Sequence, residues 1–410
     1  MKRFARLSLD HRVIIDRSSL ALISRLTRLS LPSLTVQHRS LSSLPSTQKA
    51  AVIRHQTGPV EFVTDYPVPK VGRDEVLAKV LYTGVCQSDL HTKNGTAAGA
   101  DGKNITNIKL PHIGGHEGIG RIIAIGSDVK NSSNSDSEEI RIGRYVGIRF
   151  ISRICRRCKY CLAGQEQHCI GGMTNHLHHE DGAFQEYISL DGDNLTLLPD
   201  DIDPKEMGPI LCAGITAYKC VQKCGIKPGE WLVVIGAAGG MGHLAVQYAR
   251  VVGARVIAID GGDHKRDFCL SLGAERYIDF RSVPSIVEQV QRITNGGGAH
   301  AVVCAAGSPR AYANAADMLR IGGTLACGGI PPGTPHLETS IGTIVIKGLR
   351  IVGSLVGSLR DTMEVVELTR LGKVKPAIEV RPWKDLPKVY EELENDQILG
   401  RVVLKIAEDE

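Results

Sequence analysis

The chain has 410 residues, of which 42% are hydrophobic and 23% are charged, and its formal net charge is +5 at pH 7. This length predicts two or three domains with ample core, and because no run approaches about 18 consecutive apolar residues, no transmembrane helix is expected. The first 44 residues hold eight of the 49 basic residues but only two of the 44 acidic ones. The remaining body is therefore nearly neutral, which does not indicate a nucleic-acid partner.

Residues 1–44 form an Arg-rich, Ser-rich and acid-poor leader. Within it, LALISRLTRLSL (20–31) spaces Arg among Leu and Ile as an amphipathic helix does. These features are typical of a mitochondrial transit peptide, and no uninterrupted secretory apolar region is present. We therefore predict a mitochondrial matrix protein; a disordered extension on a cytoplasmic protein is the alternative. Matrix thiols stay mostly reduced, so clustered cysteines indicate metal ligands rather than disulfides.

The segment from about residue 50 to 210 contains short β-like runs, such as 75–85 and 120–129, separated by turn residues. With little helical periodicity, it is predicted to be an irregular β-rich domain. The polar run 131–139 is predicted to be a surface loop. The histidine-rich segment 175–181, NHLHHED, is predicted to be a solvated loop rather than a metal site.

Four cysteines share the spacing C-x2-C-x2-C-x7-C within one short segment: Cys155, Cys158, Cys161 and Cys169. Four thiolates close a tetrahedral zinc site with no open position. The last spacing departs from the bacterial ferredoxin pattern, and no Pro follows Cys169, so zinc is favoured over an iron–sulfur cluster. Because a closed site cannot bind substrate, this cluster is predicted to stabilise the fold and not to carry the chemistry.

From about residue 213 the chain alternates between strand and helix patterns. This alternation predicts a parallel, doubly wound sheet of the Rossmann type. The strand candidates are 231–236, 255–260, 277–280, 301–307, 323–329 and 349–354, with helices predicted over 243–252, 285–294 and 311–320. The last segment is predicted to end in a strand, 398–406, that could return to the first domain.

A glycine-rich turn, AAGGMG (237–242), joins the first of these strands to its helix. Gly239 allows the backbone to approach a pyrophosphate and Gly242 allows close helix–strand packing, while Gly240 and Met241 complete the phosphate cradle. The residue that ends the next strand, Asp260, lies where a carboxylate bonds the adenosine ribose and repels a 2′-phosphate. The pattern predicts NAD rather than NADP. The nearby Lys265 could also contact the ribose and soften this preference, and a turn without a ligand is the alternative.

Three further residues are scattered along the chain: Cys86, His116 and Cys212. Taken singly, a buried cysteine is usually a core residue. Two thiolates and one imidazole, however, form a known catalytic zinc shell whose fourth position is open to water or an alcohol.

Residues near these candidates would suit proton transfer and ligand orientation. Ser88 could accept the proton of an alcohol, and His91 could pass it to solvent. Asp89 could orient His116 through a hydrogen bond. Glu117, beside His116, could lie near the metal and exchange with water.

Together these motifs resemble zinc-dependent alcohol dehydrogenases of the medium-chain dehydrogenase/reductase superfamily, and in particular the yeast-type, mitochondrial members. The resemblance covers residues 48–407 and rests on GVCQSDLH, GGHEGIGRI, the four-cysteine loop, PILCAGITAYK, VIGAAGGMGHLAVQYA, IDGGDHK and ILGRVV. It implies a GroES-like catalytic domain, a Rossmann NAD-binding domain and a homotetramer. The corresponding segments are the leader 1–44, the first catalytic part 45–212, the Rossmann domain 213–350 and a completing segment 351–410.

The resemblance also implies the cofactors and the reaction. Each subunit would bind two zinc ions, one structural and one catalytic, with Glu117 as an alternate catalytic ligand and Arg401 on the pyrophosphate of NAD. Ser88 and His91 would form the proton relay. The implied activity is hydride transfer between an alcohol and NAD, which interconverts the alcohol with an aldehyde or ketone.

Three departures from the family pattern bear on substrate and cofactor. Residues 92–115 contain no Phe, Tyr or Trp, Phe150 replaces a second usual Trp, and Gln87 stands where yeast-type enzymes often carry a His. A wider pocket favours, as an alternative, a zinc-dependent reductase of a bulkier aldehyde in specialised metabolism. A second alternative is a nucleotide-binding or RNA-binding member that has lost catalysis, which the full set of zinc and relay residues argues against.

Overall fold

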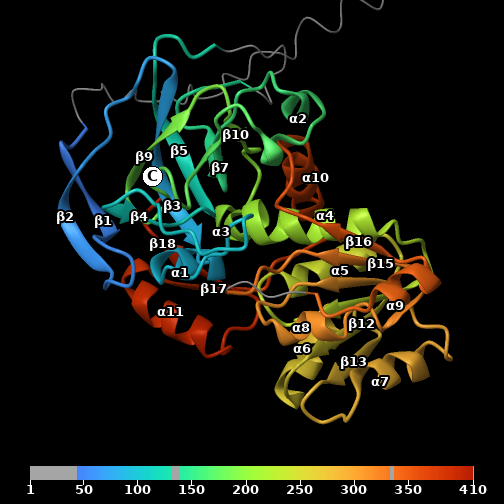
Figure 1. Cartoon of the computed structure of the whole chain (residues 1–410). Coiled ribbons are helices and arrows are strands. Elements are labelled where there is room, and N and C mark those ends of the chain that lie inside the picture. The colour runs from blue at the N-terminus through green and yellow to red at the C-terminus, as the bar shows by residue number, and fades with distance from the viewer. Residues whose placement is uncertain (1–43, 131–138, 333–336, 410) are drawn as a thin grey trace, which may run out of the picture. The chain divides into compact units, whose positions relative to one another are not determined.

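The structure, a computed structural model, describes residues 44–130, 139–332 and 337–409 (Figure 1). The predicted transit peptide, apart from its last residue, and nearly all of the predicted surface loop 131–139 lie outside the described residues. Among the described residues, no helix combines the length and the apolar character needed to cross a membrane.

The first half of the described chain is mostly β-structure, as predicted. One sheet has the strand order β2-β1-β4, a second has the order β10-β6-β5-β3-β18-β17 with β9 also paired to β3, and β7 and β8 form a small ribbon. The strands are β1 (Thr47–Ile53), β2 (Glu61–Pro67), β3 (Glu75–Gly84), β4 (His112–Ile113), β5 (Gly118–Ile125), β6 (Tyr145–Ile148), β7 (Ile151–Arg153), β8 (Thr174–Asn175), β9 (Tyr187–Asp191) and β10 (Thr196–Leu197). Short helices connect them: α1 (Gln87–Lys93), α2 (Lys159–Leu162), η5 (Glu166–His168) and α3 (Pro204–Pro209).

The C-terminal segment completes this β-structure. Strand β18 (Arg401–Lys405) pairs antiparallel with β3, with Leu404 opposite Thr83, and β17 (Ile378–Pro382) pairs parallel with β18. In Figure 1 the red C-terminal strands lie beside the blue strand β3. The loop before β18 therefore reaches the site from a part of the sequence far from the first half.

The second half of the chain contains a six-stranded parallel sheet with the order β13-β12-β11-β14-β15-β16. Its strands are β11 (Trp231–Ile235), β12 (Arg255–Asp260), β13 (Arg276–Asp279), β14 (Ala299–Cys304), β15 (Leu319–Cys327) and β16 (Arg350–Gly353). The order starts from the middle strand β11 and grows outward in both directions, as a doubly wound sheet does. The glycine-rich turn follows this middle strand.

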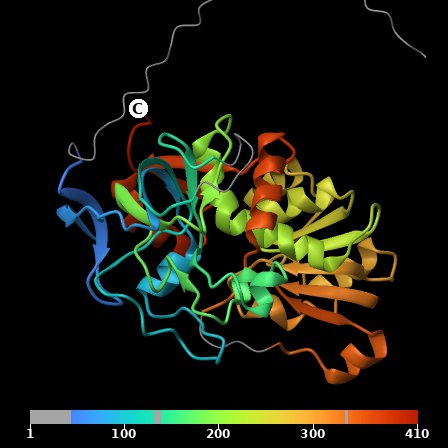
Figure 2. The same cartoon turned by 90° about the horizontal axis from the view of Figure 1, so that it is seen from above.

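Most of the remaining helices lie around this sheet: η6 (Ile210–Gly214), α4 (Ile215–Cys224), α5 (Gly242–Val251), η7 (Asp263–Lys265), α6 (Arg266–Ser271), α7 (Ile286–Ile293), α8 (Arg310–Ala313), α9 (Ile341–Lys347) and α10 (Leu359–Arg370). By contrast, η8 (Trp383–Asp385) and α11 (Leu386–Glu394) pack on the first half of the chain, where Leu386 and Tyr390 share a buried cluster with Val52 and Leu90. The helix predicted over 311–320 is wrong over most of its length, because α8 has only four residues and β15 begins at Leu319. Figure 2 shows the parallel sheet and the helices that surround it from above.

Alternate residues of the central strand face opposite sides of the sheet, as β-geometry requires. Leu232 and Val234 join one buried cluster, while Val233 and Ile235 join the other. This is why the strand is an uninterrupted apolar run and does not alternate with polar residues.

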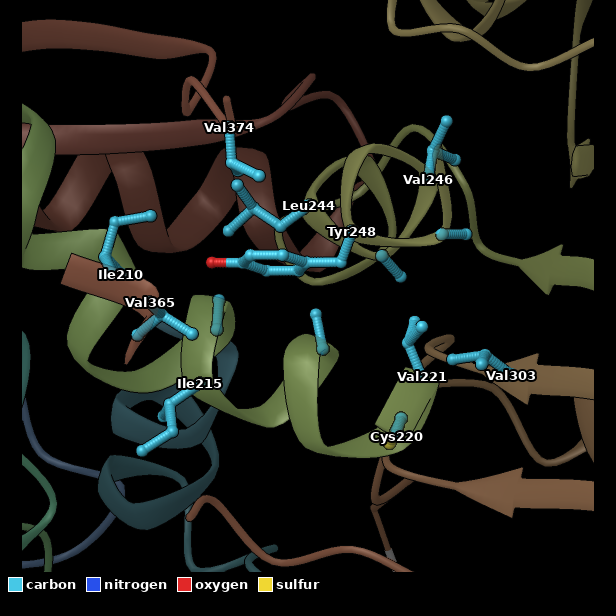
Figure 3. Close-up of a cluster of buried hydrophobic side chains, with 14 of the residues drawn as sticks. Ile210, Ile215, Cys220, Val221, Leu244, Val246, Tyr248, Val303, Val365 and Val374 are labelled. Carbon is cyan, nitrogen blue, oxygen red and sulfur yellow. The ribbon is translucent and has the colours of Figure 1, made fainter. Parts of the chain in front are cut away.

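The first cluster connects the two parts that form the site. Figure 3 shows the ring of Tyr248, from α5, among Ile210, Leu244, Val365 and Val374. These side chains come from the turn that carries Cys212, from the helix that follows the glycine-rich turn, and from the C-terminal segment. Burying one such large side chain contributes about 2 kcal/mol, so this packing holds the turn that carries Cys212 and the glycine-rich turn in a stable relative position.

Candidate active site

Four residues from three separate segments converge in the interior: Cys86, His116, Glu117 and Cys212. All four are buried, and one potential ligand atom from each lies within 4.8 Å of every other. Cys86 immediately precedes α1, His116 and Glu117 lie between β4 and β5, and Cys212 lies in η6. The structure thus brings together the three scattered candidate ligands and the candidate alternate ligand that the sequence indicates.

Cys212 is presented by an unusual piece of backbone. Residues Ile210–Gly214 form a five-residue π-helical turn between two α-helices, and Cys212 O accepts a hydrogen bond from Thr216 Oγ1 at 2.7 Å. Such turns are rare and occur frequently at functional sites. The wider turn directs the thiol of Cys212 toward His116, whose Nε2 lies 3.2 Å from Cys212 Sγ.

Asp89 organises the ligands around it. Its carboxylate accepts hydrogen bonds from the backbone of Cys86 at 3.1 Å and of Gly115 at 3.0 Å, and lies 2.9 Å from His116 Nδ1. Because a carboxylate can only accept, His116 carries its proton on Nδ1 and turns the lone pair of Nε2 toward the cysteines. This is the role that the sequence predicts for Asp89.

The donor set fits a zinc ion. The hydrogen bond from Cys212 lowers the pKa of Cys86 well below its usual value, whereas the same contact and burial raise the pKa of Cys212. Buried thiolate and carboxylate groups need a compensating cation, and two thiolates with one imidazole are ligands that zinc prefers. Glu117 Oε2 is buried and has no hydrogen-bond partner among the described residues.

A salt bridge joins the buried group around Cys86 to Arg401, which lies beside the glycine-rich turn. Arg401 Nη2, at the start of β18, donates to Glu117 Oε1, and both side chains are buried. Burial raises the pKa of Glu117 to about 7, an effect that the positive charge of Arg401 opposes. A side chain at Gly84 would lie 2.1 Å from Glu117 Oε2, so glycine at Gly84 leaves the space that this carboxylate occupies.

The predicted relay residues lie on α1. Cys86 Sγ is 3.7 Å from Ser88 Oγ, and His91 follows Ser88 by three residues, a spacing that places both on one face of the helix. His91 Nδ1 lies 3.2 Å from Thr96 Oγ1, and burial lowers the pKa of His91. No hydrogen bond joins Ser88 directly to His91 among the residues that the structure describes.

Phe150 borders the metal group. Its ring packs edge-on against that of His116, with centroids 6.3 Å apart and an interplanar angle of 79°.

The histidines of the 175–181 segment differ from the sequence prediction: His176 and His178 are buried, not solvated, and His176 Nδ1 donates to Asp181 O at 2.7 Å. The predicted solvated loop is therefore wrong for these two residues, because the loop folds inward onto the 109–113 segment, where Lys109 N donates to His178 O at 2.7 Å.

The second cysteine cluster is also assembled. The Sγ atoms of the four cysteines in residues 155–169 lie within 4.8 Å of one another, and all four thiols are half-buried. Backbone N–H groups of Cys155 and Cys158 donate to the sulfurs of Cys169 and Cys155 at 3.4 and 3.3 Å. Backbone donors lower the pKa of Cys158 to about 6, which favours the thiolate that zinc binds, whereas burial raises the pKa of Cys161 to about 12.

The glycine-rich turn provides a close-approach surface. Glycine is needed at Gly242, where a side chain would lie 1.9 Å from Gly236 O, and Gly236 itself has a φ of +76°. A side chain at Gly240 would lie 2.5 Å from Arg401 Nη1. The guanidinium of Arg401 therefore stands beside the cradle formed by Gly239, Gly240 and Met241, where a pyrophosphate would bind.

Asp260 closes the same turn from the next strand. Its carboxylate accepts hydrogen bonds from Ala238 N at 2.9 Å, Gly261 N at 2.8 Å and Lys265 Nζ at 2.9 Å. A carboxylate has about four acceptor positions, so one remains for a ribose hydroxyl. This geometry fits NAD.

Two residues at this turn are missing from the sequence prediction. His243 is fully buried; its Nδ1 lies 3.1 Å from Gly239 O, and its Nε2 accepts from Ala377 N at 3.2 Å. Asp396 contacts Lys265 at 2.9 Å. The sequence could have indicated His243, because it directly follows the glycine-rich turn. It gives no indication of Asp396, which lies in a loop more than a hundred residues away.

Comparisons with known proteins agree with this arrangement. Residues 72–200 match the family model described as alcohol dehydrogenase GroES-like domain, and residues 240–370 match the one described as zinc-binding dehydrogenase. An alcohol dehydrogenase of Schizosaccharomyces pombe is 37% identical over 371 residues, which are 89% of this chain and 99% of that protein. With the parallel sheet, these matches confirm the predicted fold class.

Solved structures show the same fold. The crystal structure of the alcohol dehydrogenase from the archaeon Aeropyrum pernix matches with a TM-score of 0.76 and 30% identity, covering 87% of this chain and 99% of that one. A structure described as an NAD-dependent alcohol dehydrogenase matches with a TM-score of 0.76 and 28% identity, covering 88% of this chain and 100% of that one.

Proposed function

Since the chain belongs to the family of zinc-binding alcohol dehydrogenases of the medium-chain superfamily, we propose that it uses the buried group around Cys86 as its catalytic centre. It is an NAD-dependent zinc oxidoreductase that interconverts alcohols with aldehydes or ketones. The observation that carries the site assignment is the convergence of two thiols, an imidazole and a carboxylate next to a dinucleotide turn.

The reaction would need both cofactors and the residues that bind and orient them. Cys86, His116 and Cys212 would hold the catalytic zinc, with Glu117 as the alternate ligand; bound zinc supplies a Lewis acid to the alcohol oxygen and NAD supplies the hydride acceptor. The four-cysteine loop would hold the structural zinc. Asp89 fixes the tautomer of His116, and Arg401 holds Glu117 while offering its guanidinium to the pyrophosphate.

The alcohol proton would leave through α1. Ser88 lies beside the Cys86 sulfur and would accept the alcohol proton while it releases its own hydroxyl proton, and His91, whose pKa burial lowers, would take up a proton and pass it to solvent. Because no hydrogen bond joins Ser88 to His91 among the described residues, a bridging group would complete this relay. In the direction of reduction, the same two residues return the proton to the product oxygen.

A substrate panel with NAD⁺ tests this proposal. Purified, zinc-loaded protein should form NADH from at least one primary or secondary alcohol, and Cys86→Ser should not.

A second candidate function is the conversion of bulky substrates. The segment 92–115 favours it, since it contains no aromatic ring that would narrow the substrate pocket. Strong turnover of ethanol with none of benzylic or branched alcohols would exclude that candidate. No NADH from any alcohol, with two zinc ions bound, would contradict the proposed function.

The domain boundaries and oligomeric state extend the proposal. We take residues 45–212 and 351–410 as the catalytic domain and 213–350 as the NAD-binding domain, because β17 and β18 join the sheet of the first half.

A homotetramer is supported by the edge strand β16 and by α9, where the exposed fractions of Ile341, Val345 and Ile346 are 73, 71 and 82%. An edge strand with exposed apolar neighbours suits pairing with a second copy. Light scattering on the eluting protein measures the mass; a monomer would contradict this part.

The composition of residues 1–44 supports import into the mitochondrial matrix, with a cytoplasmic location as the alternative. Fractionation of cells that express the chain with and without this leader distinguishes the two. Recovery of a shortened chain in the matrix, and loss of import without the leader, is the expected result.

A further inference from the structure

A buried lysine lies between two carboxylates at the adenosine end of the cofactor turn. Lys265 is 2% exposed, and its Nζ donates to Asp260 Oδ1 and to Asp396 Oδ2, each at 2.9 Å. Asp260 is the residue that faces the ribose, whereas Asp396 belongs to the loop between α11 and β18. The second carboxylate therefore reaches the NAD-binding sheet from the C-terminal segment.

The loop holds Asp396 in an uncommon backbone conformation. Its φ is +55°, in the left-handed region that most residues other than glycine avoid, although Asp and Asn tolerate it. The same loop is anchored to the cofactor turn by a hydrogen bond from Gly400 N to Ala238 O at 2.9 Å, and Ala238 N in turn donates to Asp260. These contacts direct the carboxylate of Asp396 at Lys265.

The charges around the ribose position decide which cofactor fits. Asp260, Lys265 and Asp396 together carry a net charge of −1. Other charged groups lie nearby: Asp263 pairs with Arg266 at 2.9 Å, and Arg281 lies beside Gly261 while its backbone N–H donates to Asp279 Oδ1 at 2.9 Å. Without Asp396 the three-residue group would be neutral, and two of the three N–H donors of Lys265, instead of one, would be left for a phosphate.

On the basis of the proposed function, we propose that Asp396 is a positioning residue for cofactor choice. By engaging Lys265, it keeps the adenosine ribose position negative and takes up one of the N–H donors that the lysine would otherwise offer to a 2′-phosphate. The chain is then strict for NAD although a lysine lies next to the ribose. Lys265 alone, as the sequence suggests, would soften that preference.

Binding of cofactor fragments tests this without relying on turnover. Titration calorimetry on the full, zinc-loaded protein would compare ADP-ribose with 2′-phospho-ADP-ribose for the parent and for Asp396→Asn, which keeps the shape and tolerates the left-handed backbone. Asp396→Glu restores the charge, and Glu391→Gln is a matched control, an exposed carboxylate on the preceding helix.

The expected change is specific to one ligand. In Asp396→Asn the affinity for 2′-phospho-ADP-ribose should rise about tenfold, with less than about threefold change for ADP-ribose, as the loss of one nearby charge predicts. Asp396→Glu should restore most of the parent's discrimination, and Glu391→Gln should match the parent. With NADP⁺ as cofactor, Asp396→Asn should lower KM and change kcat little.

The outcomes separate this inference from the function on which it rests. If Asp396→Asn changes both affinities by the same factor, or neither, Asp396 has only a structural role or none, and the inference is wrong while the proposed function stands. A parent protein that binds neither fragment would instead contradict the proposed NAD site, and the inference would be overturned with it.

Discussion

At the scale of single residues, Asp89 shows that the candidate zinc ligands depend on a neighbouring residue for their positions. One buried carboxylate holds the backbone at Cys86, the backbone at Gly115 and the ring of His116. Groups that orient a metal ligand commonly contribute one to two orders of magnitude to metal affinity.

Asp89→Asn should therefore weaken zinc at the catalytic site about 10-fold to 100-fold. The amide can present an N–H to His116 and no longer fixes its tautomer. Competition with a chromogenic chelator measures both zinc ions, and the four-cysteine loop in the same molecule is the internal control. Equal weakening of both ions would indicate general unfolding, and unchanged affinity at both would contradict the role of Asp89.

Replacement of a ligand itself gives a sharper result. Cys86→Ser should reduce the zinc content from two ions to one and abolish NADH formation while the fold is largely kept, because the remaining core is untouched. Elemental analysis and circular dichroism would be measured on the same sample. Two zinc ions in the variant would refute the assignment of Cys86.

At the scale of elements, the four-cysteine loop serves the fold. Glu166, within this loop, accepts a hydrogen bond from Leu359 N at the start of α10. The loop thus anchors the N-terminus of a helix that packs Val365 against the Cys212 turn (Figure 3). Its zinc would stabilise the active site from a distance without contacting substrate.

Cys158→Ser should chiefly lower stability. Loss of one of four zinc ligands should cost about 3 kcal/mol or more and lower Tm by about 5 °C or more. Calorimetric scans at a fixed rate, with and without added zinc, would measure the change, and activity at low temperature should persist. A variant as heat-stable as the parent would contradict the structural role of this loop.

At the scale of the whole molecule, His243 joins the cofactor turn to the C-terminal segment. It accepts from Ala377 N only when its ring is neutral, and burial lowers its pKa to about 4 from the usual 6.5. A folded-state pKa below the unfolded one makes its contribution complete above about pH 6.5 and progressively lost as pH falls toward 4.

Comparison with His243→Asn isolates this contribution, since Asn does not titrate in this pH range. Between pH 6.5 and 5.5 the free energy of unfolding of the parent should fall by about 1 kcal/mol more than that of the variant. Urea unfolding at both pH values measures the difference, and the other buried histidines are common to both proteins. Parallel pH profiles would show that His243 does not titrate as inferred.

Local patterns in the sequence were enough for the four-cysteine loop, the glycine-rich turn and the parallel sheet. In each, spacing over a short stretch sets the geometry: thiolates a few residues apart can meet on one ion, and an apolar strand followed by glycines and a helix forms a phosphate cradle. The scattered ligands were identifiable only in combination with these motifs, because each alone has an ordinary place in a core.

Features that depend on contacts between distant segments became visible in the folded chain alone. The buried positions of His176 and His178, the link from Arg401 to Glu117, the bond from His243 to Ala377 and the contact of Asp396 with Lys265 all depend on how loops pack. The sequence alone was enough to identify the residue types of the candidate zinc ligands and of the glycine-rich turn. Burial and charge neutralisation are properties of the packed chain, so the tautomers, the shifted pKa values and the charge at the ribose emerge only when the C-terminal segment closes on the rest.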